Sequence, residues 1–186
     1  MTDDARRPVL YVIACGGRPA GDLPGFVTSV RADGWDVCVV ATPSGLKFMD
    51  TGTLVELTGH VVRSEYKQPD EPDVLPPPDA LVVAPATFNT TCKWAHGSSD
   101  TLALGLLNEA IGLDLPVVAV PHPSSALARH PAFLESVSRL RAWGVTVLFD
   151  PGVYRLPAPE REPSPAPLFP WEALTSEVRA IRASLG

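Results

Sequence analysis

Polar residues able to hold an anion follow three of the apolar runs in this sequence. Gly16 and Gly17 come after residues 9–14, and hydroxyl residues come after residues 36–41 and 80–84. Glycine lets backbone N–H groups approach a phosphate, and a Ser or Thr hydroxyl can donate a further hydrogen bond. Each loop alone is also typical of a turn or a helix cap, but together they indicate a phosphate cradle. The hydroxyl candidates are Thr42, Ser44, Thr87 and Thr90.

Other kinds of site find little support in the sequence. It has neither a G-x-G-x-x-G segment after the first apolar run nor a P-loop, which favours a mononucleotide over a dinucleotide or a nucleoside triphosphate. The four histidines show no i,i+4 ligand spacing on an expected helix. The three cysteines, Cys15, Cys38 and Cys92, indicate neither a disulfide framework nor a metal site. We therefore expect no metal.

Such loops must be positioned by a parallel sheet, because ligands of open sheets bind beyond the carboxyl ends of the strands. Apolar, β-branched runs predict strands, and helical periodicity between them predicts helices. This alternation predicts an α/β fold, a doubly wound parallel sheet of the Rossmann-like, flavodoxin-like kind in a single domain. The expected strands are residues 9–14, 36–41, 61–63 (a weak one), 80–84, 116–120 and 145–149. The expected helices are residues 22–33, 51–58, 88–96, 100–112, 131–143 and 171–184.

Proline marks the boundaries of the expected domain. We assign residues 1–156 to the ligand-binding domain, 157–170 to a Pro-rich extended segment and 171–186 to a C-terminal helix. Repeated proline excludes both a helix and a central strand from the extended segment. The C-terminal helix has an apolar face, which we expect to dock on the domain or on a neighbouring subunit. A second Pro-rich stretch, residues 67–78, predicts an exposed connection.

Composition narrows the choice of partners. The 186 residues carry a formal net charge of −6 and no run of basic residues, so the electrostatic attraction that binds nucleic acid is missing. The first apolar run is about seven residues long, too short for a membrane span or a secretion signal. We expect a cytoplasmic protein that binds neither nucleic acid nor a membrane.

The segment from Ala84 to Gly97, APATFNTTCKWAHG, carries a family resemblance. It resembles the PASANT or PATANT segment of the homo-oligomeric flavin-containing cysteine decarboxylases. That family includes phosphopantothenoylcysteine decarboxylases and the peptidyl-cysteine decarboxylases of lantibiotic biosynthesis. The similarity extends from about Val9 to Pro151, and Thr42–Phe48 (TPSGLKF) matches at the same spacing. The resemblance implies that residues 1–156 bind FMN, in a trimer or larger homo-oligomer acting on a small-molecule or peptide substrate.

The resemblance also implies which residues contact FMN and substrate. It puts the FMN phosphate on the loop Gly16-Gly17-Arg18, and it puts Asn89 where such enzymes contact the substrate carboxylate. Arg18 and Lys47 either neutralise the phosphate or are ordinary solvated charges. The full cofactor-binding set that it implies is Gly16, Gly17, Arg18, Thr42, Ser44, Phe48, Thr87, Phe88, Asn89, Thr90 and His122.

Two departures from the family pattern concern catalysis. Glu71 stands where the family has a histidine used in oxidising the cysteine side chain, and a carboxylate titrates well below neutral pH unless it is buried. The family's substrate-recognition segment PxMNxxMW is replaced by residues 121–128, PHPSSALA, in which His122 is a candidate acid or base. The candidate catalytic residues are therefore Asn89, His122 and Glu71.

Three functions agree with this pattern. The first is an FMN-binding flavoprotein with altered or non-decarboxylase chemistry. The second is an FMN-dependent oxidative decarboxylase of a cysteine-containing substrate. The third is a non-catalytic flavin-binding regulatory subunit that assembles with an active paralogue. A retained phosphate cradle beside an altered chemical centre favours the first function.

Overall fold

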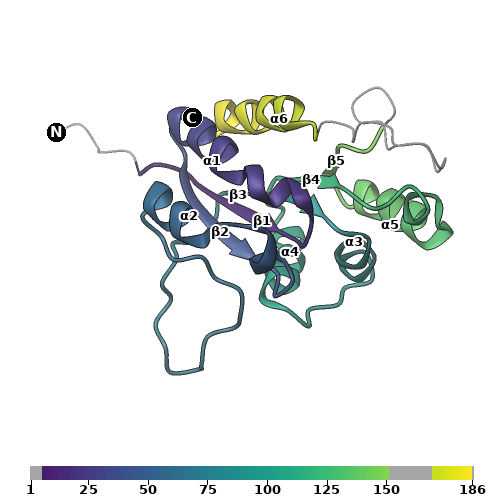
Figure 1. The fold of residues 1–186 in the computed structure, drawn as a ribbon, viewed down its shortest axis with the longest axis horizontal. Helices are drawn as coiled ribbons and strands as arrows, with labels where there is room; N and C mark the ends of the chain where they lie inside the picture. Colours follow the sequence, from purple (N-terminus) through teal and green to yellow (C-terminus); the bar gives the residue numbers. More distant parts are fainter. Residues whose placement is uncertain (1–5, 151–168, 186) are drawn as a thin grey trace.

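The computed structural model describes residues 6–150 and 169–185, whose strands form one parallel sheet (Figure 1). The strand order is β2-β1-β3-β4-β5. Because the order reverses between β1 and β3, the loops after these two strands border the same crevice, as in flavodoxin-like folds. The predicted fold class is confirmed. The strands are β1 (Val9–Ala14), β2 (Asp36–Ala41), β3 (Ala80–Ala86), β4 (Val117–Pro121) and β5 (Thr146–Val147).

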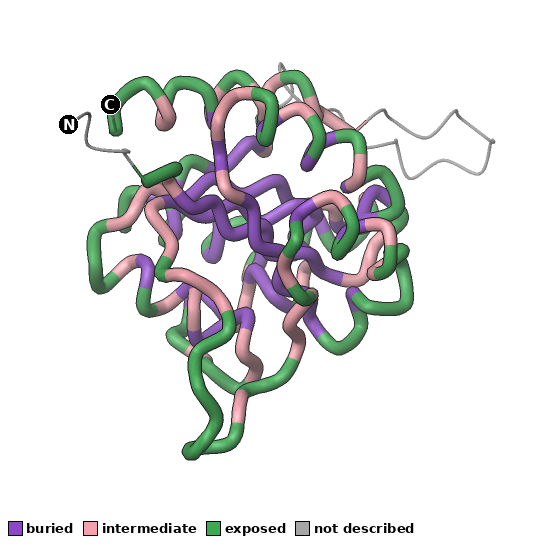
Figure 2. The backbone as a smooth tube through the Cα atoms, turned by 90° about the vertical axis from the view of Figure 1, so that its left-hand side faces the viewer, coloured by how far each residue is buried: buried purple, intermediate pink, exposed green. Residues whose placement is uncertain are grey.

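Helices cover both faces of this sheet (Figure 1). Alternate residues of β1 face opposite ways, so that Leu10 belongs to one core cluster and Tyr11 to the other. Because both faces are covered, β1, β3 and β4 are buried at every residue, and buried chain fills the centre of the tube in Figure 2. One face carries α1 (Leu23–Ala32), α2 (Thr51–Thr58) and α6 (Trp171–Ser184). The other carries α3 (Phe88–Trp94), α4 (Leu102–Gly112) and α5 (Pro131–Ala142).

Side-chain caps fix where the two helices nearest the crevice begin. The Thr87 hydroxyl accepts a hydrogen bond from the Thr90 N–H at 3.3 Å and caps α3. The Thr101 hydroxyl accepts from the Leu104 N–H at 3.3 Å and caps α4. Such caps satisfy amide groups that have no partner within the helix. The cap at Thr101 explains why α4 begins two residues later than the predicted start.

Two of the predicted strands differ from the structure. Residues 61–63 form no strand. Arg63 makes a single parallel bridge to Val40, and Val61 is 51% exposed beside the edge strand. The strand predicted over residues 145–149 is reduced to β5. The last ladder bond runs from the Leu148 N–H to the Ala119 carbonyl at 2.9 Å, and pairing ends there because the next donor on β4 would be Pro121, which has no N–H.

The C-terminal helix α6 docks on this chain's own domain. Leu174 and Val178 are fully buried in the core cluster beneath α1 and α6. The ring of Trp171 stacks on Phe26 with centroids 5.4 Å apart. Of the two docking partners considered from the sequence, the domain itself is the one observed. Residues 151–168, which hold most of the Pro-rich segment, lie outside the described residues.

The long connection between α2 and β3 runs away from the sheet at the lower left of Figure 1. Two tyrosines tie it to the domain. The Tyr66 hydroxyl lies 3.2 Å from the Ser99 carbonyl oxygen and 3.1 Å from the Thr101 carbonyl oxygen. The Tyr11 hydroxyl donates to the Pro76 carbonyl at 2.8 Å. Most of the connection is exposed, as its proline content predicts. No helix within residues 6–150 and 169–185 is long and apolar enough to cross a bilayer.

Candidate functional site

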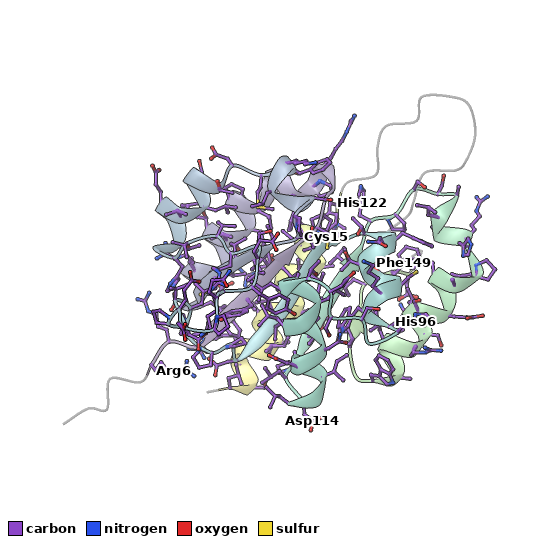
Figure 3. All side chains as sticks on the ribbon, turned by 90° about the horizontal axis from the view of Figure 1, so that it is seen from below. Arg6, Cys15, His96, Asp114, His122 and Phe149 are labelled. Carbon is purple, nitrogen blue, oxygen red and sulfur yellow. The ribbon has the colours of Figure 1, made fainter. Side chains whose placement is uncertain are left out.

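The carboxyl ends of four strands are aligned by backbone hydrogen bonds. The N–H groups of Cys15, Thr42 and His122 donate to carbonyls at neighbouring strand ends, at 3.1, 2.9 and 2.8 Å. In Figure 3, Cys15 and His122 lie at this edge of the sheet, and Arg6 and Asp114 lie toward the opposite edge. The loops after β1, β2, β3 and β4 therefore share one edge, where ligands of this fold class bind.

A hollow of about 380 Å³ opens at this edge between the loops after β1 and β2, one face of α3 and the start of α4. Most of its polar groups are hydroxyls. Six of the residues that the sequence predicts to contact a ligand line this hollow. They are Gly16, Thr42, Ser44, Thr87, Asn89 and Thr90. Its other lining residues are Pro43, Lys93, Thr101 and Leu104.

Glycine is required where the loops after β1 and β2 meet. A Cβ added at Gly16 would lie 3.1 Å from Ser44 Cβ and 3.3 Å from Phe48 Cε2. A Cβ added at Gly45 would lie 2.4 Å from the Ala14 carbonyl oxygen, closer than van der Waals contact allows. The two loops can approach this closely only without a side chain at Gly45, and a side chain at Gly16 would crowd Ser44 and Phe48.

The hydroxyls of the hollow are oriented by bonds that use them as acceptors. Thr42 Oγ1 accepts from the Gly45 N–H at 3.1 Å. Thr90 Oγ1 accepts from the Thr87 hydroxyl at 3.0 Å and from the Cys15 thiol at 3.4 Å. Burial raises the pKa of the Cys15 thiol, which keeps it protonated as a donor. Thr42 and Thr90 retain their own hydroxyl hydrogens, so both can donate to an anion.

A cationic side chain that the sequence reasoning did not select also lines the hollow. Lys93 lies one helical turn after Thr90 on α3 and forms an ion pair with Asp100. The available signal was the i,i+3 spacing from Thr90, which places both residues on one helix face. Thr101 and Leu104, from the start of α4, were also missed because nothing local in the sequence brings α4 beside α3.

Five residues of the implied cofactor-binding set do not line the hollow, namely Gly17, Arg18, Phe48, Phe88 and His122. Gly17 packs against the Pro85 ring, and Arg18 is exposed at the start of a short 3₁₀ helix. The Phe88 ring instead stacks on Phe133, with centroids 5.9 Å apart, and so packs toward α5. Phe48 is 43% exposed and reaches the site over Gly16.

The two candidate acid–base residues are also separated from the hollow. Glu71 is exposed on the long connection, where its carboxylate accepts from the Gln68 N–H at 3.0 Å, and it borders a different groove with Tyr66. His122 follows β4, and its half-buried ring contacts Phe169 edge-on at 5.8 Å. Burial lowers the pKa of His122, which favours the neutral imidazole at neutral pH. The described residues contain no cluster of His, Cys, Asp and Glu suited to a metal ion.

Comparison with known proteins points to one family. A family model described as Flavoprotein matches residues 3–182. The coenzyme A biosynthesis bifunctional protein CoaBC of Mycolicibacterium smegmatis is 28% identical over 167 residues, which are 88% of this chain and 39% of that protein. The chain therefore spans about two fifths of the length of this relative and of its mycobacterial counterparts.

Solved structures share the same fold. The FMN-dependent cysteine decarboxylase TvaF from thioviridamide biosynthesis has a TM-score of 0.71 at 23% identity, covering 94% of this chain and 99% of TvaF. The FMN-binding protein AtHal3 has a TM-score of 0.72 at 22% identity, covering 96% and 98% of the two chains. At this level of identity the likeness establishes the fold.

Proposed function

Because this chain belongs to the Flavoprotein family, we propose that it binds FMN with the phosphate in the hollow at the carboxyl edge of the sheet. The observation that carries the proposal is the close approach at Gly16, where an added Cβ would meet Ser44 and Phe48. A bare backbone beside hydroxyl donors suits a phosphate group. The FMN-dependent and FMN-binding neighbours of the same fold support FMN as the choice of flavin.

The donors of the hollow fit a phosphate. Thr42 and Thr90 each have a hydroxyl hydrogen left to donate, and the exposed Ser44 beside Gly16 adds a third hydroxyl. These residues would hold the phosphate, and Phe48 would cover the loop at Gly16. When bound, FMN supplies two-electron redox chemistry, while the protein supplies position and electrostatics.

Titration with FMN, followed by quenching of flavin fluorescence, tests this proposal. Wild-type protein is expected to bind FMN saturably, and Ser44→Ala to bind it on the order of tenfold more weakly, because a hydrogen bond to a charged group is lost. Ser138→Ala, an exposed position on α5 away from the hollow, is the matched control and is expected to bind like wild type. Absence of saturable binding to wild type would refute the proposal.

We propose further that the reaction differs from ordinary cysteine decarboxylation. Among the described residues that line the hollow there is neither an imidazole nor a carboxylate. Glu71, which stands where the family pattern has histidine, borders another groove of this chain. The segment 121–128 also retains none of the Met, Asn and Trp residues of the family's recognition pattern. His122 is the remaining candidate acid or base near this edge.

One observation favours oxidative decarboxylation as a second candidate. Asn89 lines the hollow and is exposed, so its amide is accessible to a substrate carboxylate. Carbon dioxide release from FMN-loaded protein, measured with a panel of cysteine-ending peptides and with phosphopantothenoylcysteine, separates the candidates. The altered-chemistry proposal expects no release. Release that disappears in Asn89→Ala would establish decarboxylation instead.

We also propose that the chain assembles as a homotrimer or larger homo-oligomer with a small-molecule or peptide substrate. Large apolar side chains beside the hollow support an assembly interface there, since Leu46 is 39% and Phe48 43% exposed. Light scattering coupled to size-exclusion chromatography should give the mass of a trimer or larger particle. A monomer in that measurement would exclude the assembly.

A further inference from the structure

The hollow has one source of positive charge in the part of the chain that the structure describes. Of its lining residues, Lys93 is the only one with a formal charge. The chain as a whole carries a formal net charge of −6, so the surroundings do not favour an anion. A phosphate in this hollow would therefore depend on Lys93 for charge neutralisation.

Lys93 can pair with an aspartate of the protein and with a ligand in the hollow at the same time. Its ammonium pairs with Asp100, which precedes α4 and is not part of the wall of the hollow. An ammonium group has three donors, so one bond to Asp100 leaves two for another acceptor. The side chain is 38% exposed and forms part of the wall of the hollow. The face of α3 that carries Lys93 is also the face that carries Thr90.

The other cations that the sequence suggests for phosphate binding lie outside the wall of the hollow. Arg18 and Lys47 are both exposed, and neither lines the hollow. Exposed charges of this kind contribute little, because water and salt screen them. The structure therefore separates one cation in the wall from two that lie outside it.

We propose that Lys93 is the residue that recognises the phosphate of the flavin and that Asp100 holds its ammonium at the rim of the hollow. This inference rests on the proposed binding of FMN. It assigns a specificity role to Lys93, because a flavin without a phosphate gains nothing from this cation. The protein should therefore prefer FMN to riboflavin, and Lys93 should account for much of that preference.

The test compares FMN with riboflavin in fluorescence titrations of wild type and of Lys93→Gln. We expect Lys93→Gln to weaken FMN binding about tenfold, as for the loss of a partly exposed charge-assisted bond, and to leave riboflavin binding unchanged. Lys93→Arg keeps the charge and should retain most of the preference for FMN. Lys67→Gln is the matched control, because it removes a lysine that also pairs with an aspartate, Asp73, but lies outside the hollow. It should bind both flavins like wild type.

Asp100→Asn keeps the inference testable if Lys93→Gln fails to fold. It keeps the cation but removes the carboxylate that positions it, so the preference for FMN should fall, though by less than in Lys93→Gln. An unchanged or increased preference would overturn the inference. An unchanged preference in folded Lys93→Gln would overturn it too, while FMN binding itself stands. Failure of the wild-type protein to bind FMN would instead refute the proposed function, and the inference with it.

Discussion

At the scale of single residues, two glycines of this chain should respond oppositely to alanine. Gly45→Ala puts a Cβ against the Ala14 carbonyl and should lower the free energy of unfolding by about 1–3 kcal/mol. Gly25→Ala, inside α1 with no atom within 4 Å of the new Cβ, should raise it by about 0.5–1 kcal/mol. Urea denaturation measures both changes. Equal effects at the two positions would contradict the close approach at Gly45.

Thiol reactivity should distinguish the three cysteines. Burial raises the pKa of Cys15, and it raises the pKa of Cys38 to about 12, so both remain protonated at pH values near 8. Cys92 is only partly buried. A colorimetric thiol reagent should therefore label Cys92 well before the other two, and Cys92→Ser should remove the fast phase. Fast labelling of Cys15 in the folded protein would show that its bond to Thr90 is not maintained.

The half-buried His122 should make stability depend on pH. Burial lowers its pKa below the ordinary value of 6.5, so the unfolded chain binds a proton more readily than the folded one. Stability from this group is complete above pH 6.5 and is lost as the pH falls from there through the lowered folded-state pKa. Urea unfolding at pH 7.5 and pH 5 should therefore show a larger loss for wild type than for His122→Gln. An equal loss would mean that His122 is readily protonated in the folded protein.

At the scale of elements, α6 is expected to be part of the folding unit. Leu174 is fully buried against the domain, so Leu174→Ala should cost about 2–5 kcal/mol of unfolding free energy. Ser176→Ala, an exposed position on the same helix, is the control and should change it little. Because the chain has four tryptophans, Trp171 is followed by ¹⁹F NMR of fluorotryptophan-labelled protein, with its signal assigned from Trp171→Phe. The unfolding of Trp171 should then coincide with unfolding of the sheet. An early, separate transition at Trp171 would mean that α6 is an independent appendage.

The sequence predicts the central elements well and the edges poorly, for a physical reason. The strands expected over residues 9–14 and 36–41 coincide with β1 and β2, because strands buried on both faces are continuous apolar runs. At the edges, pairing depends on what neighbours supply. A longer β5 would need an N–H from Pro121 of β4, and nothing within residues 145–149 reveals that this donor is missing.

In the candidate site, too, the sequence predicts some residues and misses others. Hydroxyls and glycines placed directly after strands are identifiable from the sequence, because the carboxyl ends of parallel strands must meet at one edge. Lys93 and Thr101 come together through packing of α3 beside α4, and Phe88 turns toward α5 through contacts with Phe133 and His130. These arrangements involve residues distant in sequence, so local periodicity does not predict them.

At the scale of the whole molecule, the family resemblance carried by residues 84–97 is confirmed by the family match over residues 3–182. The hollow also lies where the strand order reverses, between β1 and β3. Fold and site therefore agree on where a flavin phosphate would bind. What the family does not determine is the reaction, because the residues that depart from its pattern, Glu71 and segment 121–128, are those implied in catalysis.

The most direct test of FMN binding is the absorbance spectrum of the purified protein, followed by titration of any colourless material with FMN. We predict the bands of oxidised flavin, or saturable binding of added FMN that is tighter than that of riboflavin. A colourless, folded protein that neither shifts the FMN spectrum nor quenches its fluorescence would contradict the assignment of the hollow as a flavin phosphate site.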